Sequence, residues 1–219
     1  MAAVMPRELT EYIETRILPG YTRFDSAHNI EHAQRVLANS MAIAEDYDVN
    51  MAMVYVIAAY HDVGLIDGRD GHEKASAALL LADDALKQWF ADDELSVMAQ
   101  AVEDHRASND CEPRSLYGKI IAEADRDIDY ATILKRTVQY SLEHFPRYNF
   151  EQHFERTISH LNEKYGENGY LKCWLNTAQN MRQLAELRNN IADGVKISAD
   201  FQSVYDALTN QASSAAKPA

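Results

Sequence analysis

The feature that most constrains this chain is a charge-free apolar run that ends in an adjacent histidine and aspartate. The run is Met51–Tyr60; His61 and Asp62 follow it, and Gly64 comes two residues later. Ten residues are too few to span a bilayer, so the run predicts a helix buried in a soluble core that stops near the glycine. A buried carboxylate is costly unless a positive partner meets it. Asp62 therefore predicts a basic residue or a metal ion beside it.

Further residues with metal-binding side chains lie on both sides of this pair in the sequence. His32 lies upstream, on a helix that apolar spacing predicts from Ile30 to about Tyr47. It falls at the edge of the buried face, from which a side chain can point into a pocket. His28, one turn earlier, is expected near the mouth of that pocket. The downstream residues are His72, His105 and Asp125.

Taken in order, His32, the adjacent His61 and Asp62, and the distant Asp125 resemble the motif of the HD-domain superfamily of metal-dependent phosphohydrolases. The resemblance covers about residues 24–130, roughly half of the chain. It implies an all-α HD-domain fold and a divalent metal ion held by these four residues.

The resemblance also bears on the number of metal ions. Some members of the superfamily bind a second ion through two further histidines, and the aspartate of the His-Asp pair bridges the two ions. His72 and His105 stand at those places in the order, so one or two ions per chain are expected. The chain departs from the HD-GYP cyclic-dinucleotide phosphodiesterases, because Leu65 replaces their lysine and no Gly-Tyr-Pro segment follows His105.

The chemistry of the ligand set narrows the metal and the reaction. Imidazoles and carboxylates without a thiolate suit divalent Mn, Fe, Ni, Co, Zn or Mg. Such an ion activates water and polarises a phosphoryl oxygen, while cations offset the charge that develops on the transferred group. Asp62 is the expected central carboxylate, and Glu73 or Asp129 could orient water or an imidazole. The candidate cations are Arg106, Lys74 and Arg126, with Arg35 and Arg69 as secondary candidates.

The remaining pattern predicts helices throughout. A chain of 219 residues with only 8 glycines and 5 prolines favours long helices with short connections, and no alternating pattern indicates a sheet. We expect one all-α domain over 1–211, with an HD core at about 24–130, a C-terminal helical part at 131–211 and a disordered tail at 212–219. The predicted helices are 6–17, 30–47, 51–61, 72–89, 92–105, 115–125, 130–143, 150–165, 171–190 and 198–211.

Charge and cysteine usage limit the partners. A net charge of −13 opposes binding to nucleic acid. Cys111 and Cys173 read as free thiols, and no signal peptide or membrane-spanning run is visible, so a cytoplasmic protein without a membrane partner is expected. The segment 64–71 has three glycines but lacks the lysine of a phosphate-binding P-loop. The C-terminal helices complete the core or form the interface of a homo-oligomer.

Three functions are consistent with the sequence. The leading hypothesis is hydrolysis of a phosphoester or phosphoanhydride bond in a small phosphorylated molecule. The small stand-alone HD proteins that this chain resembles imply a nucleotide. The first alternative is an HD-fold di-iron oxygenase that oxidises a small molecule, since it needs the same histidines and aspartates at six positions in the same order. The second is a non-catalytic helical domain that binds a metal and has a regulatory or ligand-sensing role.

Overall fold

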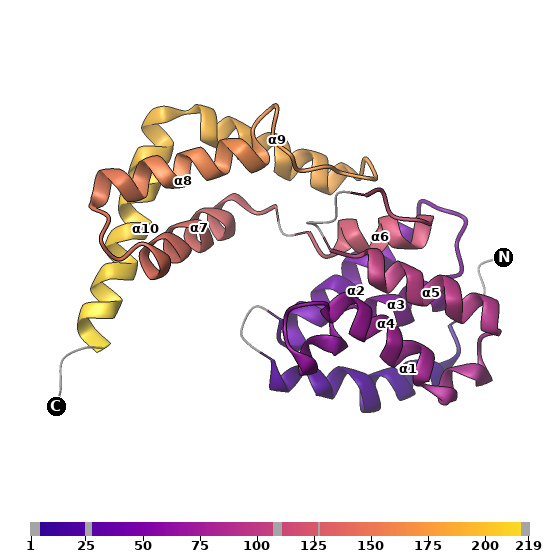
Figure 1. Cartoon of the computed structure of the whole chain (residues 1–219). Helices are drawn as coiled ribbons and strands as arrows, with labels where there is room; N and C mark the ends of the chain where they lie inside the picture. The colour runs from indigo at the N-terminus through magenta and orange to yellow at the C-terminus, as the bar shows by residue number, and fades with distance from the viewer. Residues whose placement is uncertain (1–4, 25–27, 107–110, 127, 216–219) are drawn as a thin grey trace. The chain divides into compact units, whose positions relative to one another are not determined.

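The computed structural model describes residues 5–24, 28–106, 111–126 and 128–215, and the side chains among them as far as Asn210. Every regular element in these ranges is helical and none is a β-strand (Figure 1), which confirms the predicted all-α fold. Among the described residues, no helix combines the length and the apolar character needed to cross a membrane.

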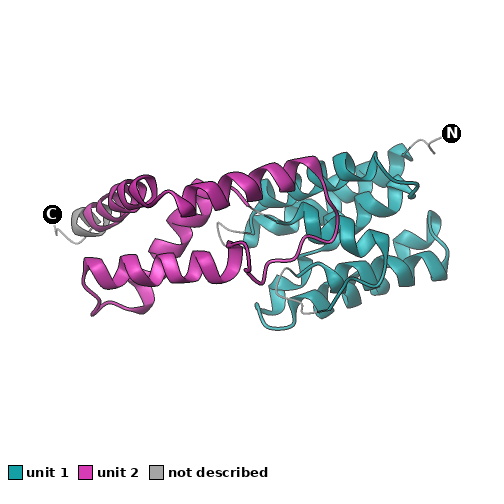
Figure 2. Ribbon diagram, turned by 90° about the horizontal axis from the view of Figure 1, so that it is seen from above, with its two compact units in different colours: residues 1–126 teal, residues 127–219 magenta. Residues whose placement is uncertain are grey.

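The chain forms two compact units, Met1–Arg126 and Asp127–Ala219 (Figure 2), and each has its own hydrophobic core. The division lies close to residue 130, where we expected the HD core to end. That the two units behave as one domain stays a prediction. The described helices of the first unit are α1 (Arg7–Tyr12), η1 (Ile13–Ile17), η2 (Leu18–Arg23), α2 (Ile30–Ala44), α3 (Met51–Tyr60), η3 (Val63–Asp67), α4 (His72–Ala82), η4 (Asp84–Gln88), α5 (Asp92–Asp104) and α6 (Leu116–Ala124).

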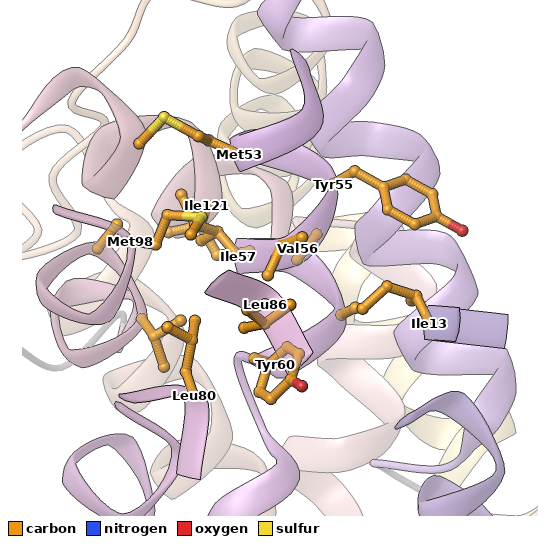
Figure 3. Close-up of a cluster of buried hydrophobic side chains, with 14 of the residues drawn as sticks. Ile13, Met53, Tyr55, Val56, Ile57, Tyr60, Leu80, Leu86, Met98 and Ile121 are labelled. Atoms are coloured by element: carbon orange, nitrogen blue, oxygen red, sulfur yellow. The ribbon is translucent and has the colours of Figure 1, made fainter. Parts of the chain in front are cut away.

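Helix α3 is the centre of the first unit. All of its residues from Met53 to Tyr60 are buried, as the charge-free run predicts. Figure 3 shows its side chains among those of neighbouring helices. Asn50 begins the helix by accepting a hydrogen bond from the Ala52 N–H at 3.0 Å. Because every face of α3 is covered, the chain leaves it with His61 and Asp62 still inside the protein. The labelled neighbours are Ile13, Leu80, Leu86, Met98 and Ile121.

The second unit consists of α7 (Tyr130–His144), α8 (Phe150–Tyr165), α9 (Ala178–Ala192) and α10 (Gly194–Ala215). Its core includes Val138, Leu161, Leu187 and Phe201, all completely buried. Polar residues begin three of these helices by accepting backbone N–H groups, and two of the three, α7 and α8, start at the predicted residues. These caps are Asp129, Asn149 and Thr177.

Several predicted helix boundaries were wrong. The first helix continues as η1 and η2 to Arg23 instead of ending near Ile17, because proline is tolerated in the first turn of the 3-10 segment. The predicted helix 72–89 is interrupted after Ala82, where the Asp83 carboxylate caps η4 and also accepts the Tyr12 and Tyr60 hydroxyls. Residues 171–177 precede α9 and are not helical.

The end of the chain also differs from the expected boundary. Helix α10 extends from Gly194 to Ala215, whereas we expected the last helix over 198–211 and a disordered tail from residue 212. Residues 216–219 of the predicted tail lie outside the described residues.

Candidate metal centre

The six residues named from the sequence lie together in the first unit, and each stands at or beside the end of a helix. His32 is in the first turn of α2, and its backbone N–H is bound by the capping Asn29 side chain at 3.0 Å. His61 ends α3 and Asp62 follows it, so a completely buried helix carries both into the cluster. The other three positions are the start of α4 for His72, the end of α5 for His105 and the end of α6 for Asp125.

The first group surrounds one oxygen of the central carboxylate. Asp62 Oδ2 lies 3.5 Å from His32 Nε2 and 3.3 Å from His61 Nε2, and the two Nε2 atoms are 3.1 Å apart. Asp125 Oδ1 lies 3.3 Å from His32 Nε2 and 4.0 Å from His61 Nε2. The first metal position predicted from the motif therefore has all four of its residues around one point.

The second group surrounds the other oxygen of the same carboxylate. Asp62 Oδ1 lies 3.2 Å from His72 Nε2 and 3.4 Å from His105 Nε2. The rings of His72 and His105 are edge to face, with centroids 5.3 Å apart. Asp62 thus belongs to both groups, with one oxygen facing each.

These atoms suit divalent metal ions. Ligand atoms about 2.1 Å from an octahedral ion lie about 3.0 Å apart when they are adjacent, close to the spacing in each group. Two trios could hold an ion, His32 with His61 and Asp62, and Asp62 with His72 and His105, and every residue in them is buried. Nitrogen and carboxylate oxygen donors match first-row divalent metals. Asp125 completes the first trio from α6.

Backbone carbonyl groups orient three of the four imidazoles. A carbonyl only accepts, so Nδ1 of His61, His72 and His105 must carry the proton. The distances to the acceptors are 2.7 Å to Ala58 O, 2.8 Å to Arg69 O and 2.6 Å to Val102 O, in each case the carbonyl three residues earlier. The unprotonated Nε2 atoms of the neutral rings then face Asp62, as metal ligands do.

The Asp62 carboxylate dominates the electrostatics. Burial alone would raise the pKa of Asp62, but the surrounding imidazoles outweigh it and hold this pKa well below its usual range. Burial would likewise lower the pKa of His61, yet Asp62 raises it to about 9. The hydrogen bond to Asp62 raises the pKa of His72. In the absence of a metal the centre therefore holds protons that a metal ion would displace.

Two residues that the sequence did not single out hold the His-Asp turn in place. The buried Tyr21 hydroxyl donates to Ala59 O at 3.0 Å and accepts the Asp62 N–H at 3.2 Å, and its ring stacks on His61. Ser76 Oγ accepts the Gly64 N–H at 2.9 Å and ties η3 to α4. Tyr21 falls between the predicted helices 6–17 and 30–47, and no local pattern marks it.

The three leading candidate cations have different surroundings. Arg106 Nη1 lies 3.4 Å from Glu73 Oε2, which is itself 3.6 Å from His72 Nδ1. Arg126 is buried beside Glu123, with Nε and Oε1 3.3 Å apart. Lys74 is exposed and, two residues from His72, projects about 200° away around α4.

The remaining residues named from the sequence are Arg35, Arg69, Asp129 and His28. Arg35 Nη2 lies 3.1 Å from His32 Nδ1, whereas Arg69 contributes its backbone carbonyl to His72. Asp129 caps α7 in the second unit. The His28 ring lies edge to face with His32, 5.8 Å between centroids.

Comparison with known proteins agrees with the sequence motif. The family model of the HD domain matches residues 29–128. Among solved structures, a predicted HD superfamily hydrolase from an uncultured Thermotogales bacterium is similar over 70% of this chain and 83% of its own, with 23% sequence identity and a TM-score of 0.47. No curated protein matches.

Proposed function

The chain belongs to the HD-domain superfamily through residues 29–128, and we propose from this that it is a metal-dependent hydrolase of phosphoester or phosphoanhydride bonds. The observation that carries the proposal is the Asp62 carboxylate, which presents one oxygen to each of two imidazole groups. Divalent ions held by the two groups would supply Lewis-acid activation of water and of the phosphoryl group.

The residues around the centre have distinct roles in this proposal. The Asp125 side chain is 22% exposed and that of Asp62 4%, so water and substrate reach the centre on the Asp125 side. Asp125 can accept a hydrogen bond from the attacking water there. Glu73 holds Arg106 close to His72, which keeps a positive charge beside the second group. Neither role requires Lys74, which is exposed.

The proposed substrate is a small phosphorylated molecule of the nucleotide class. The net charge of −13 argues against long nucleic acids, so the substrate is expected to be small enough to be bound by local cations. A cytoplasmic location and self-association through the C-terminal helices remain part of the proposal.

The proposal is tested by replacing the shared carboxylate. Asp62→Ala removes a ligand from both groups, so we expect loss of bound metal and at least about a 100-fold loss of kcat/KM. The assay is release of phosphate from p-nitrophenyl phosphate and a panel of nucleotides with Mn²⁺. Asp67→Ala, which removes an exposed carboxylate from the same segment, serves as the control. Full activity in Asp62→Ala would refute the site.

The same shared carboxylate favours one alternative, a di-iron centre that oxidises a small molecule with O₂. Elemental analysis of protein purified without added metal separates the two functions. Two irons per chain together with substrate-dependent O₂ consumption would support the oxygenase. Phosphate release by an iron-free, colourless Mn²⁺ form would exclude it.

A non-catalytic role predicts a different result. The metal would bind tightly, no phosphoester would be turned over, and one nucleotide would raise the melting temperature strongly.

A further inference from the structure

Arg35 differs from the other basic residues near the centre in what it contacts. Its guanidinium lies 3.1 Å from His32 Nδ1, and no carboxylate within the described ranges pairs with it. Arg106 and Arg126 each face a glutamate, at 3.4 Å and 3.3 Å. A carboxylate partner neutralises much of the charge that an anion would meet, so Arg35 has the more available positive charge.

The His32 ring links Arg35, at Nδ1, to the Asp125 carboxylate, at Nε2. His32, its partner, is 3.3 Å from Asp125 Oδ1, and Asp125 has the more exposed of the two central carboxylates. Arg35 itself is exposed on α2, so its side chain can turn without disturbing the core. A guanidinium binds phosphate oxygens in pairs, which suits it to an incoming phosphate group.

The contact with His32 is incompatible with metal binding at that ring. Arginine only donates hydrogen bonds, so the contact requires an unprotonated Nδ1 on His32. A neutral imidazole that binds a metal through Nε2 carries its proton on Nδ1 instead. Loading the first group with metal must therefore release Arg35 from His32.

We propose that Arg35 is a substrate-binding residue, which metal loading releases from His32 to bind phosphate oxygens on the Asp125 side of the centre. The assignment rests on the proposed function, because it names the residue that recognises the anionic part of the substrate. It differs from the sequence analysis, in which Arg106, Lys74 and Arg126 ranked ahead of Arg35.

The test compares two affinities in Arg35→Gln. Titration of inorganic phosphate into the Mn²⁺-loaded protein should give an affinity about 10- to 100-fold weaker than in the wild type, the value of a charged hydrogen-bonded contact. Titration of Mn²⁺ into metal-free protein should give an affinity equal to or greater than that of the wild type, since the competing contact is gone. Arg35→Lys keeps the charge without the paired donors and should weaken phosphate binding less. Arg16→Gln is the control, because it removes an arginine whose charge acts on Tyr12, a residue outside the centre.

The two affinities separate the proposal from a structural role. A variant that merely disturbs α2 would lose Mn²⁺ and phosphate together, and that result would overturn the assignment. Unchanged phosphate affinity in Arg35→Gln with full Mn²⁺ occupancy would also overturn it, while leaving the proposed hydrolase intact. A wild-type protein that binds Mn²⁺ but neither binds phosphate nor releases it from any ester would refute the proposed function and the Arg35 assignment together. In the hydrolase assay, the KM of Arg35→Gln should rise by a larger factor than its kcat falls.

Discussion

One carboxylate, that of Asp62, meets four imidazole rings through its two oxygens. Removing so many polar groups from water would be unfavourable without this mutual pairing. The pairing explains why the pKa of Asp62 falls despite its burial and why that of His61 rises. The same groups must give up protons before they can bind a metal.

The raised pKa of His61, about 9, predicts how metal affinity depends on pH. Because a metal binds the neutral ring, we expect the apparent Mn²⁺ affinity to rise steadily between pH 6.5 and 8.5, with proton release on binding. The unfolding free energy of the metal-free protein should instead fall as the pH rises. The pKa of His61 in the folded state lies above its unfolded value of about 6.5. The stability that the His61 charge contributes is therefore complete below pH 6.5 and is lost as the pH rises through 9.

Mn²⁺ titrations and urea unfolding of chelated protein at several pH values would measure the two trends. A Mn²⁺ affinity that falls with pH would contradict the assignment of His61 as a ligand.

Tyr21 shows how a residue outside the motif positions the centre. Tyr21→Phe keeps the ring on His61 but leaves the Asp62 N–H and Ala59 O without their partner. We expect a loss of about 1–3 kcal/mol in unfolding free energy and about a 10-fold loss in metal affinity. Tyr12→Phe, which loses a hydroxyl contact with Asp83 instead, is the control. It should lower stability and leave metal affinity unchanged; equal metal affinities in both variants would exclude a positioning role for Tyr21.

At the scale of elements, helix ends build the centre. A residue at the end of a helix is held by the helix but can turn its side chain toward a neighbouring element. The close approach of η3 to α4 brings His72 to Asp62, and it depends on Gly64. A Cβ at this glycine would lie 2.4 Å from both His72 O and the Ser76 backbone N. Gly64 therefore serves close packing, beyond the helix-stop role expected from its place in the sequence.

Gly64→Ala tests this approach. Because the clash is with backbone atoms, we expect a loss of about 1–3 kcal/mol in stability, with weaker binding of the second metal ion. Gly20→Ala is the matched control, since nothing lies within 4 Å of a Cβ placed there. Elemental analysis would report the ratio of metal to protein; two ions per chain retained in Gly64→Ala would show that the second metal position does not depend on this close approach.

At the scale of the whole molecule, the chain has two separate hydrophobic cores, around α3 in the first unit and Phe201 in the second. All six candidate ligands belong to the first unit. A ligand raises the stability of the part that binds it. Metal loading should therefore act on the first unit.

Calorimetry can separate the two units. We expect two transitions, of which Mn²⁺ raises one by several degrees, and chelation reverses the shift. Ile57→Ala should lower the metal-sensitive transition and Phe201→Ala the other, each through a loss of about 2–5 kcal/mol in its own core. A single transition that both variants shift equally would show that the units unfold as one domain.

The sequence by itself determined the helical class, the buried helix that ends at His61, and the six residues that lie together. Those features depend on local apolar spacing, on capping residues and on a motif that is read from the order of its residues along the chain. Their role as metal ligands stays a prediction. Only the tertiary structure decided that the two oxygens of Asp62 face one group each and that Tyr21 holds the Asp62 backbone. These facts depend on which surfaces of different helices meet, and long-range packing sets that geometry beyond the reach of local spacing.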